Sequence, residues 1–297
     1  DEGKRRALCA ALEEALEDIP VPAGDPFFDP GNTGTVTIPL DRSAGDPNSS
    51  VRQQMNNITS FIDASNVYGS SPSRVAALRA NDGTGRLKTS AGDLLPYNTG
   101  ALPNAPTDHD PTMFVAGDIR ANEQIGLTAM HTLWVREHNY HADQIRAANP
   151  GYSGEEIFEH ARAIVAAEMQ AITYNEFLPA LLGSQMGQYT GYDPSVEGSI
   201  KNEFATAFYR PGPSMLSPEI KRLDNSGDVI PEGNLSLAQA FFNPTLITDE
   251  GGIDPILKGL ASQVMQDIDA KVVGDVRNML FGPPGAGKGT QAAKIIT

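Results

Sequence analysis

The stretch from about Ile119 to Ala148 constrains the fold most, because it is the longest part of the chain whose apolar residues recur at helical spacing. It stops at Asn149, Pro150 and Gly151, which together end a helix. His131, His138 and His141 follow one another at steps of seven and three, so they fall on one stripe of this helix. The sequence therefore predicts a long central helix with three histidines on one face.

Shorter helices and loops are predicted around the central helix. Ser153 followed by Glu156 forms a capping-box pattern that opens a helix through about Ile172. Further predicted elements are a strand over 35–40, a helix that starts within 52–62, and helices over 2–17, 177–182, 200–208 and parts of 236–278. The predicted fold class is mainly α, with long irregular loops rich in Gly, Pro, Asp and Asn.

The composition of the chain limits which binding partners are expected. The net charge of -15 repels phosphate backbones and anionic lipid, so neither nucleic acid nor a membrane surface is an expected partner. No apolar run approaches the roughly 18 residues that span a bilayer, and the first residues show no signal-peptide-like apolar stretch. Cys9 is the only cysteine, which excludes an intramolecular disulfide.

Three motifs follow one another along the chain: TSFIDASNVYGS at 59–70, GRLKTSAGDLLPYN at 85–98 and FVAGDIRANEQIGLTAMHTLWVREHNYH at 114–141. Together they resemble the animal-type haem peroxidases. The resemblance implies one helical, incomplete haem-peroxidase-like domain over 19–278. The amphipathic helix within 1–18, predicted from its leucine spacing, and the tail at 279–297, which is not expected to form a domain, lie outside it. The resemblance also implies an exported enzyme that oxidises small electron donors with hydrogen peroxide, using haem b and Ca²⁺.

The third motif carries the haem residues that the resemblance implies. His138 in REHN would be the proximal iron ligand, and Arg136 would meet a haem propionate. Arg120 would be the distal arginine that assists cleavage of the O–O bond, and Glu123 would form an ester with a haem methyl group. Without the resemblance, a single histidine is more often a core or surface residue, and Arg120 with Glu123 would be an ion pair one helical turn apart.

The first motif spaces oxygen donors as a calcium loop does. Side-chain oxygens of Thr59, Asp63 and Ser65, with the carbonyl oxygen of Phe61, would supply the hard ligands that Ca²⁺ prefers. The resemblance assigns these four positions to calcium. The alternative is an Asx-type turn that begins a helix.

The chain departs from the family in three places. It has no W-G-Q-x-x-D-H-D segment, which supplies the distal histidine, and the only partial substitute is His109 in a proline-rich loop. Residues 211–214 read PGPS where relatives have an FGHS-like site, and no N-x-x-R-G-R-D-H-G segment follows residue 278. We therefore expect an incomplete domain with weak peroxidase turnover. The alternative is a non-catalytic scaffold that binds haem or calcium.

The tail contains a different motif. FGPPGAGKGTQAA at 281–293 resembles the phosphate-binding loop of adenylate kinases, with Gly287, Lys288 and Thr290 at the nucleotide-binding positions. A working site also needs a following helix and a parallel sheet, for which too few residues remain. Nucleotide binding through this tail stays as a further alternative function.

Overall fold

The computed structural model describes residues 19–26, 28–38, 45–51, 53–106, 110–205, 209, 212–269 and 271–276. The predicted helix over 1–18, Cys9, His109, Pro211 and the whole tail at 279–297, with Gly287, Lys288 and Thr290, lie outside these residues.

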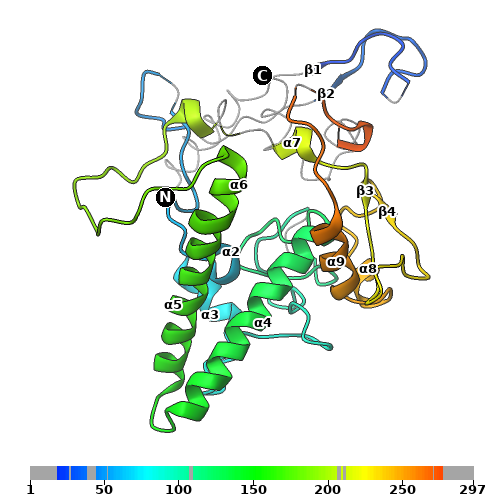
Figure 1. The fold of residues 1–297 in the computed structure, drawn as a ribbon. Helices are drawn as coiled ribbons and strands as arrows, with labels where there is room; N and C mark the ends of the chain where they lie inside the picture. The colour runs from blue at the N-terminus through cyan, green and yellow to red at the C-terminus, as the bar shows by residue number, and fades with distance from the viewer. Residues whose placement is uncertain are drawn as a thin grey trace.

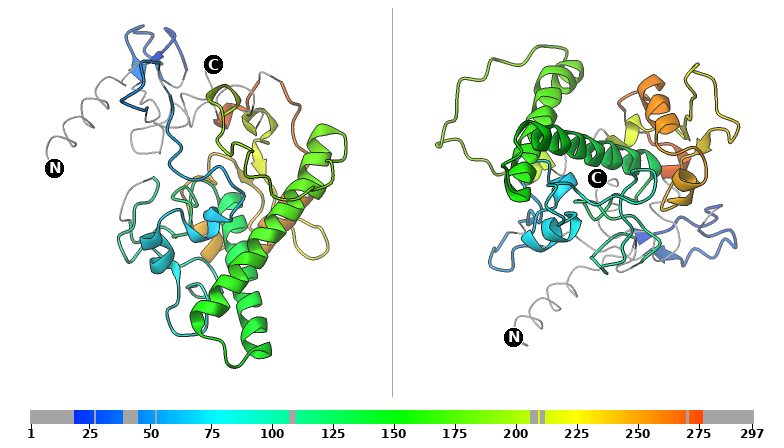
Figure 2. Two further views of the ribbon diagram at one scale, coloured as in Figure 1. Left: turned by 90° about the vertical axis from the view of Figure 1, so that its left-hand side faces the viewer. Right: turned by 90° about the horizontal axis from the view of Figure 1, so that it is seen from below.

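Two long helices dominate the described part. Helix α4 spans Ile125–Ala148 and α5 spans Gly154–Ile172, and a short turn joins them into an antiparallel hairpin. Figures 1 and 2 show the two helices meeting at the turn and diverging from it in a V. The capping box forms as predicted, since the backbone N–H of Glu156 donates to Ser153 Oγ at 3.2 Å and that of Ser153 donates to Glu156 Oε2 at 2.8 Å.

Shorter elements surround this hairpin. Helix α5 continues through a π-helical turn, η1, at Thr173–Phe177 into α6 at Leu178–Leu182, so the two predicted helices form one continuous rod. The other helices are α2 (Ser65–Tyr68), α3 (Pro72–Leu78), α7 (Gly212–Met215), α8 (Thr245–Thr248) and α9 (Asp254–Ser262). No described helix is both long and apolar enough to cross a bilayer.

Strands are few and short among the described residues. Ile19–Pro20 (β1) pairs antiparallel with Thr37–Ile38 (β2), and Glu219–Ile220 (β3) pairs antiparallel with Leu235–Ser236 (β4). Strand β2 confirms the strand predicted within 35–40, and the mainly helical class is confirmed.

The core lies where α4 packs against α5, α2 and α9. Its apolar residues include Phe114, Ile125 and Phe158, each at most 1% exposed. Arg222, which follows β3, is also completely buried. Its guanidinium pairs with Glu250 at 2.6 Å and donates to the carbonyl oxygens of Gly233 and Glu232 at 2.6 and 2.9 Å. Because all three of its nitrogens have partners, the buried charge is compensated.

One predicted helix start and one predicted helix were wrong. The central helix begins at Ile125, with the Gln124 side chain capping it by accepting a hydrogen bond from Gly126 N at 2.6 Å, so residues 119–124 form a turn ahead of the helix. The described residues of 53–62 contain no helix. Here bends and local side-chain turns replace the expected helical hydrogen bonds.

Candidate functional site

His138 lies at the centre of the fold and is 0% exposed. Its Nδ1 is 2.9 Å from the hydroxyl of Tyr68 on α2, and its Nε2 is 2.9 Å from the carbonyl oxygen of Gly85. The rings of Tyr68 and Phe158 pack against the imidazole, with centroids 5.4 and 5.2 Å away. Both ring nitrogens are therefore engaged by protein groups.

The hydrogen-bond partners and the burial of His138 together determine which of its nitrogens carries the hydrogen. A carbonyl oxygen can only accept, so Nε2 carries the hydrogen and donates to Gly85, while Nδ1 accepts from the Tyr68 hydroxyl. Burial lowers the pKa of His138 to about 4, so the imidazole is neutral at pH 7. The same burial raises the pKa of Tyr68, which keeps its hydroxyl a donor.

This geometry does not fit the predicted role of His138 as iron ligand. An iron ligand needs an unprotonated ring nitrogen with an open lone pair. Nε2 of His138 carries a proton, and the lone pair of Nδ1 already accepts from Tyr68. In the haem-free fold both nitrogens of His138 contact protein groups, as in most single core histidines, and its role as iron ligand stays a prediction.

The REHN motif fastens one loop to the central helix. Arg136 donates to the carbonyl oxygens of Gly92 and Asp93, both at 2.9 Å, and Asn139 makes two hydrogen bonds with the backbone of Leu87, at 2.8 and 3.1 Å. With the bond from His138 to Gly85, three residues of the motif hold the segment 85–93. The three family motifs thus meet at His138, because Tyr68 belongs to the first, Gly85 to the second and His138 to the third.

Arg136 is consequently engaged by protein groups. Besides its two carbonyl acceptors, its Nη1 is 3.6 Å from a carboxylate oxygen of Asp254 at the start of α9. Its hydrogen bonds use Nε and Nη2, and the predicted contact of Arg136 with a propionate stays a prediction.

His131 differs from His138 in having one unpartnered nitrogen. It is 4% exposed, and its Nδ1 lies 2.8 Å from the carbonyl oxygen of Leu127, one turn earlier in α4. Its Nε2 is buried and has no hydrogen-bond partner within the described structure. Since the carbonyl accepts from Nδ1, Nε2 presents a lone pair. Such an arrangement, with a backbone carbonyl fixing the tautomer, is common in histidines that bind metals.

Charged groups of the AGDIRANE turn lie near His131. Arg120 donates to both carboxylate oxygens of Asp118, at 2.9 and 2.6 Å. This hydrogen bonding raises the pKa of Arg120, and the charge of Glu123 adds to the effect. Burial lowers the pKa of His131, whereas the charge of Asp118 opposes the shift and that of Arg120 adds to it. The predicted proximity of Arg120 and Glu123 fits the structure, although both precede the helix.

The predicted calcium loop makes local turns. The backbone N–H of Phe61 donates to Thr59 Oγ1 at 3.1 Å, and that of Ser65 donates to Asp63 Oδ1 at 3.0 Å. Ser65 is also the first residue of α2, so the loop has the features of an Asx-type turn that begins a helix. The side chain of Phe61 projects outward and is 70% exposed.

A surface hollow of about 380 Å³ lies elsewhere, at the turn end of the hairpin, where Ile145, Asn149, Tyr152 and His160 contribute to its walls. Helix α4 has 24 residues and is therefore about 36 Å long. The hollow and Arg120 lie near opposite ends of this helix, so the hollow is not part of the group around Arg120 and His131.

Comparison with known proteins identifies the class and then the family. A helical fold of this kind occurs in peroxidase A from Dictyostelium discoideum, with a TM-score of 0.83, 30% identity, and coverage of 96% of this chain and 58% of that protein. The family model described as animal haem peroxidase matches residues 2–296, so the chain belongs to the animal haem peroxidase family.

Curated relatives agree with this assignment. The chain is 45% identical over 222 residues to the peroxidasin homolog of Mus musculus, covering 70% of this chain and 15% of that protein. It is 40% identical over 230 residues to the thyroid peroxidase of Sus scrofa, covering 71% of this chain and 25% of that protein. The predicted family is confirmed, and the chain spans only a fraction of the length of these relatives.

Sequence reasoning missed the partners of His138 and the free nitrogen of His131. Tyr68 and Gly85 both belong to the quoted motifs, so the co-occurrence of the three motifs was the available indication that they touch. The different environments of His131 and His138 had no counterpart in the sequence, because helical spacing places both on the same stripe.

Proposed function

We propose that the chain forms part of a haem-dependent peroxidase, an oxidoreductase in which hydrogen peroxide is the acceptor and a small molecule is the electron donor. Membership of the animal haem peroxidase family supports the class. The observation in the fold that carries the proposal is the buried, unpartnered Nε2 of His131 beside the charged turn of Asp118 and Arg120. By likeness to the family, we also propose that the protein is exported.

The unpartnered nitrogen of His131 supports a bound polar group. A buried nitrogen without a partner costs about 1–3 kcal/mol, which a ligand that binds this nitrogen would recover. We therefore propose that His131 offers its nitrogen to the haem, and the role of His138 as iron ligand stays a prediction. When bound, haem supplies the electron transfer between peroxide and donor.

The neighbouring charges have a separate role. Arg120 is held by both oxygens of Asp118, so its guanidinium is fixed in orientation and cannot lose its proton. A fixed cation of this kind stabilises negative charge that develops on an oxygen atom. Because Asp118 already neutralises much of this charge, we expect slow turnover. Glu123 supplies a second carboxylate in the same turn, and we propose it as the residue that could anchor the haem.

Calcium binding at 59–65 is a second part of the proposal. Thr59 and Asp63 hold this loop in a turn, and the carbonyl of Ile62 is fixed by a hydrogen bond from Gln170 on α5 at 2.8 Å. A loop whose carbonyl and carboxylate oxygens are already ordered loses less entropy on binding a cation. Calcium-dependent thermal stabilisation that Asp63→Asn abolishes would support this site, and stabilisation unaffected by Asp63→Asn would contradict it.

The haem proposal is tested by titrating the protein with haemin and following the Soret band. His131→Leu keeps the side-chain volume and removes the unpartnered nitrogen, so the apoprotein should remain folded. We expect a stoichiometric Soret shift in the wild type and its loss in His131→Leu. His160→Ala is the matched control, because His160 is exposed and stacks on Tyr152 on the surface.

Peroxide turnover with a phenolic donor distinguishes a working peroxidase from a non-catalytic haem-binding scaffold. Turnover that falls in Arg120→Leu at unchanged haemin affinity would support a peroxidase. Haem binding without turnover would establish the non-catalytic scaffold, which the neutralisation of Arg120 by Asp118 favours. The absence of a saturable Soret shift, or a shift unchanged in His131→Leu, would refute the proposed role of His131.

A further inference from the structure

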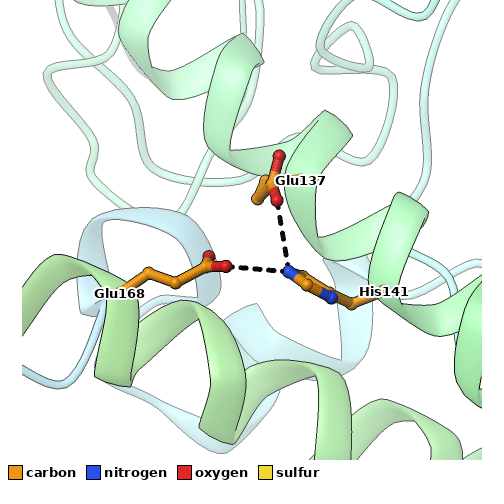
Figure 3. Close-up of side chains that lie close together, drawn as sticks. All are labelled: Glu137, His141 and Glu168. Carbon is orange, nitrogen blue, oxygen red and sulfur yellow. Dashed lines mark hydrogen bonds and ion pairs between the residues drawn. The ribbon is translucent and has the colours of Figure 1, made fainter.

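Two carboxylates from different helices converge on one nitrogen of His141. Nε2 of His141 is 2.9 Å from Glu168 Oε1 on α5 and 3.2 Å from Glu137 Oε1, one turn earlier on α4. Figure 3 shows both carboxylates directed at the same nitrogen of the imidazole, that of Glu137 from the same helix and that of Glu168 from the facing helix. We propose that Glu137, His141 and Glu168 form a binding site for a divalent transition metal, with Zn²⁺ as the best match.

The charges of this group favour a cation. A ring nitrogen carries at most one hydrogen, so Nε2 can make a good hydrogen bond to only one of the two carboxylates at a time. With a neutral imidazole, the group has two negative charges within a short distance and no cation of its own. Like charges that approach so closely repel each other. A divalent ion in place of the hydrogen would bring the charge of the group to zero.

The distances also suit zinc. Zinc binds imidazole nitrogen and carboxylate oxygen at about 2.0–2.2 Å, which puts neighbouring ligand atoms of a tetrahedral site about 3.3 Å apart. The observed distances of 2.9 and 3.2 Å differ from this value by only a few tenths of an ångström. One atom from each of the three residues lies within 4.8 Å of the others. Small side-chain shifts would therefore create the site.

An unpartnered carboxylate oxygen is an independent indication of a cation site. The second carboxylate oxygen of Glu168, Oε2, is buried and has no hydrogen-bond partner within the described structure. A buried carboxylate oxygen without a hydrogen-bond donor destabilises the fold. A cation that contacts both oxygens of the Glu168 carboxylate would offset this cost. The unpartnered oxygen belongs to the same side chain that makes the shorter contact with His141.

The scaffold holds the three groups in place. Glu137 and His141 are four residues apart on α4, so they face the same side, and Glu168 faces them from α5. Sites on helices are more precisely positioned than sites on loops. The side chains of Glu137, His141 and Glu168 are 37%, 18% and 34% exposed, so water can reach a fourth coordination position. Three protein ligands and one open position are the arrangement of catalytic zinc sites.

Zinc binding to the metal-free chain is the test, measured by isothermal titration. Glu168→Gln and Glu137→Gln keep the size of each side chain and remove its charge. His141→Ala removes the imidazole. Glu159→Gln and His160→Ala are matched controls, because both residues are exposed on α5. Replacing zinc by Co²⁺ adds a readout of geometry, since tetrahedral Co²⁺ with a nitrogen ligand absorbs strongly in the visible range.

We expect one equivalent of Zn²⁺ to bind the wild type and both controls. Each ligand variant should lose at least the 10- to 100-fold in affinity that is typical when even an outer-shell partner of a metal is removed. If Glu168→Gln fails to fold, as circular dichroism would reveal, the half-exposed Glu137 provides the decisive variant. Zinc affinity unchanged in Glu137→Gln or His141→Ala, or no saturable binding by the folded wild type, would overturn the proposal.

Discussion

Replacing His138 by alanine should destabilise the protein before any cofactor is considered. The substitution removes a fully buried imidazole together with its hydrogen bonds to Tyr68 and Gly85. Each partner left unsatisfied costs about 1–3 kcal/mol, and the cavity left by the ring costs about 2 kcal/mol or more. The expected loss is therefore about 4 kcal/mol or more, a large part of the 5–15 kcal/mol that is typical of a folded protein.

The assay is urea unfolding of the haem-free protein, followed by far-ultraviolet circular dichroism. His160→Ala is the matched control and should change the free energy of unfolding by less than about 0.5 kcal/mol, because surface substitutions generally do. Tyr68→Phe removes only the hydroxyl and should cost about 1–3 kcal/mol. Its effect should be much smaller in a His138→Ala background, since the two groups share one hydrogen bond.

The assay on the haem-free protein tests the contribution of His138 to the core, and haemin binding tests a role toward haem separately. If His138→Ala cost no more than His160→Ala, the hydrogen bonds of His138 would not stabilise the fold. That result, together with the loss of haemin binding in His138→Ala, would refute the assignment of His138 to the core.

Two further predictions follow from the burial of ionisable side chains. Burial lowers the pKa of His138 from 6.5 to about 4, so between these pH values the unfolded chain binds a proton that the folded chain does not. The free energy of unfolding is therefore highest above about pH 6.5 and falls as the pH is lowered to about 4. The expected loss is up to about 3 kcal/mol. Urea midpoints measured across this range should fall more steeply for the wild type than for His138→Phe, and parallel curves would contradict the prediction. Arg222→Met should cost about 3 kcal/mol, because it leaves Glu250 and two carbonyl oxygens without their donor. Equal thermal midpoints for Arg222→Met and a surface variant such as Arg146→Met would show that this buried ion pair contributes nothing.

The sequence predicted the hairpin well because its determinants are local. The helical spacing over α4, the stop at 149–151 and the Ser153 capping box all act within a few residues, and α4 and α5 end and begin accordingly. The start of α4 was misplaced because helical spacing alone does not reveal the cap at Gln124. Residues 119–124 continue the spacing, but their backbone turns instead.

The site was less predictable because its determinants are distant in sequence. The partners of His138 come from residues 70 and 53 positions away, and the loop held by Arg136 lies more than 40 positions away. Spacing within a motif carries no information about such contacts. The resemblance placed the residues in the correct family but gave His138 a role that its hydrogen bonds do not fit.

The three histidines of α4 show how one helical stripe can carry three kinds of chemistry. They share a face, yet their neighbours change along the helix because α4 and α5 diverge from the turn that joins them (Figure 1). His138 meets Tyr68 and Gly85 and is neutral and satisfied. His141 meets carboxylates of both helices, and His131 keeps a free nitrogen near Arg120. A substitution at each position should therefore affect a different property: apoprotein stability at His138, zinc affinity at His141 and haemin affinity at His131.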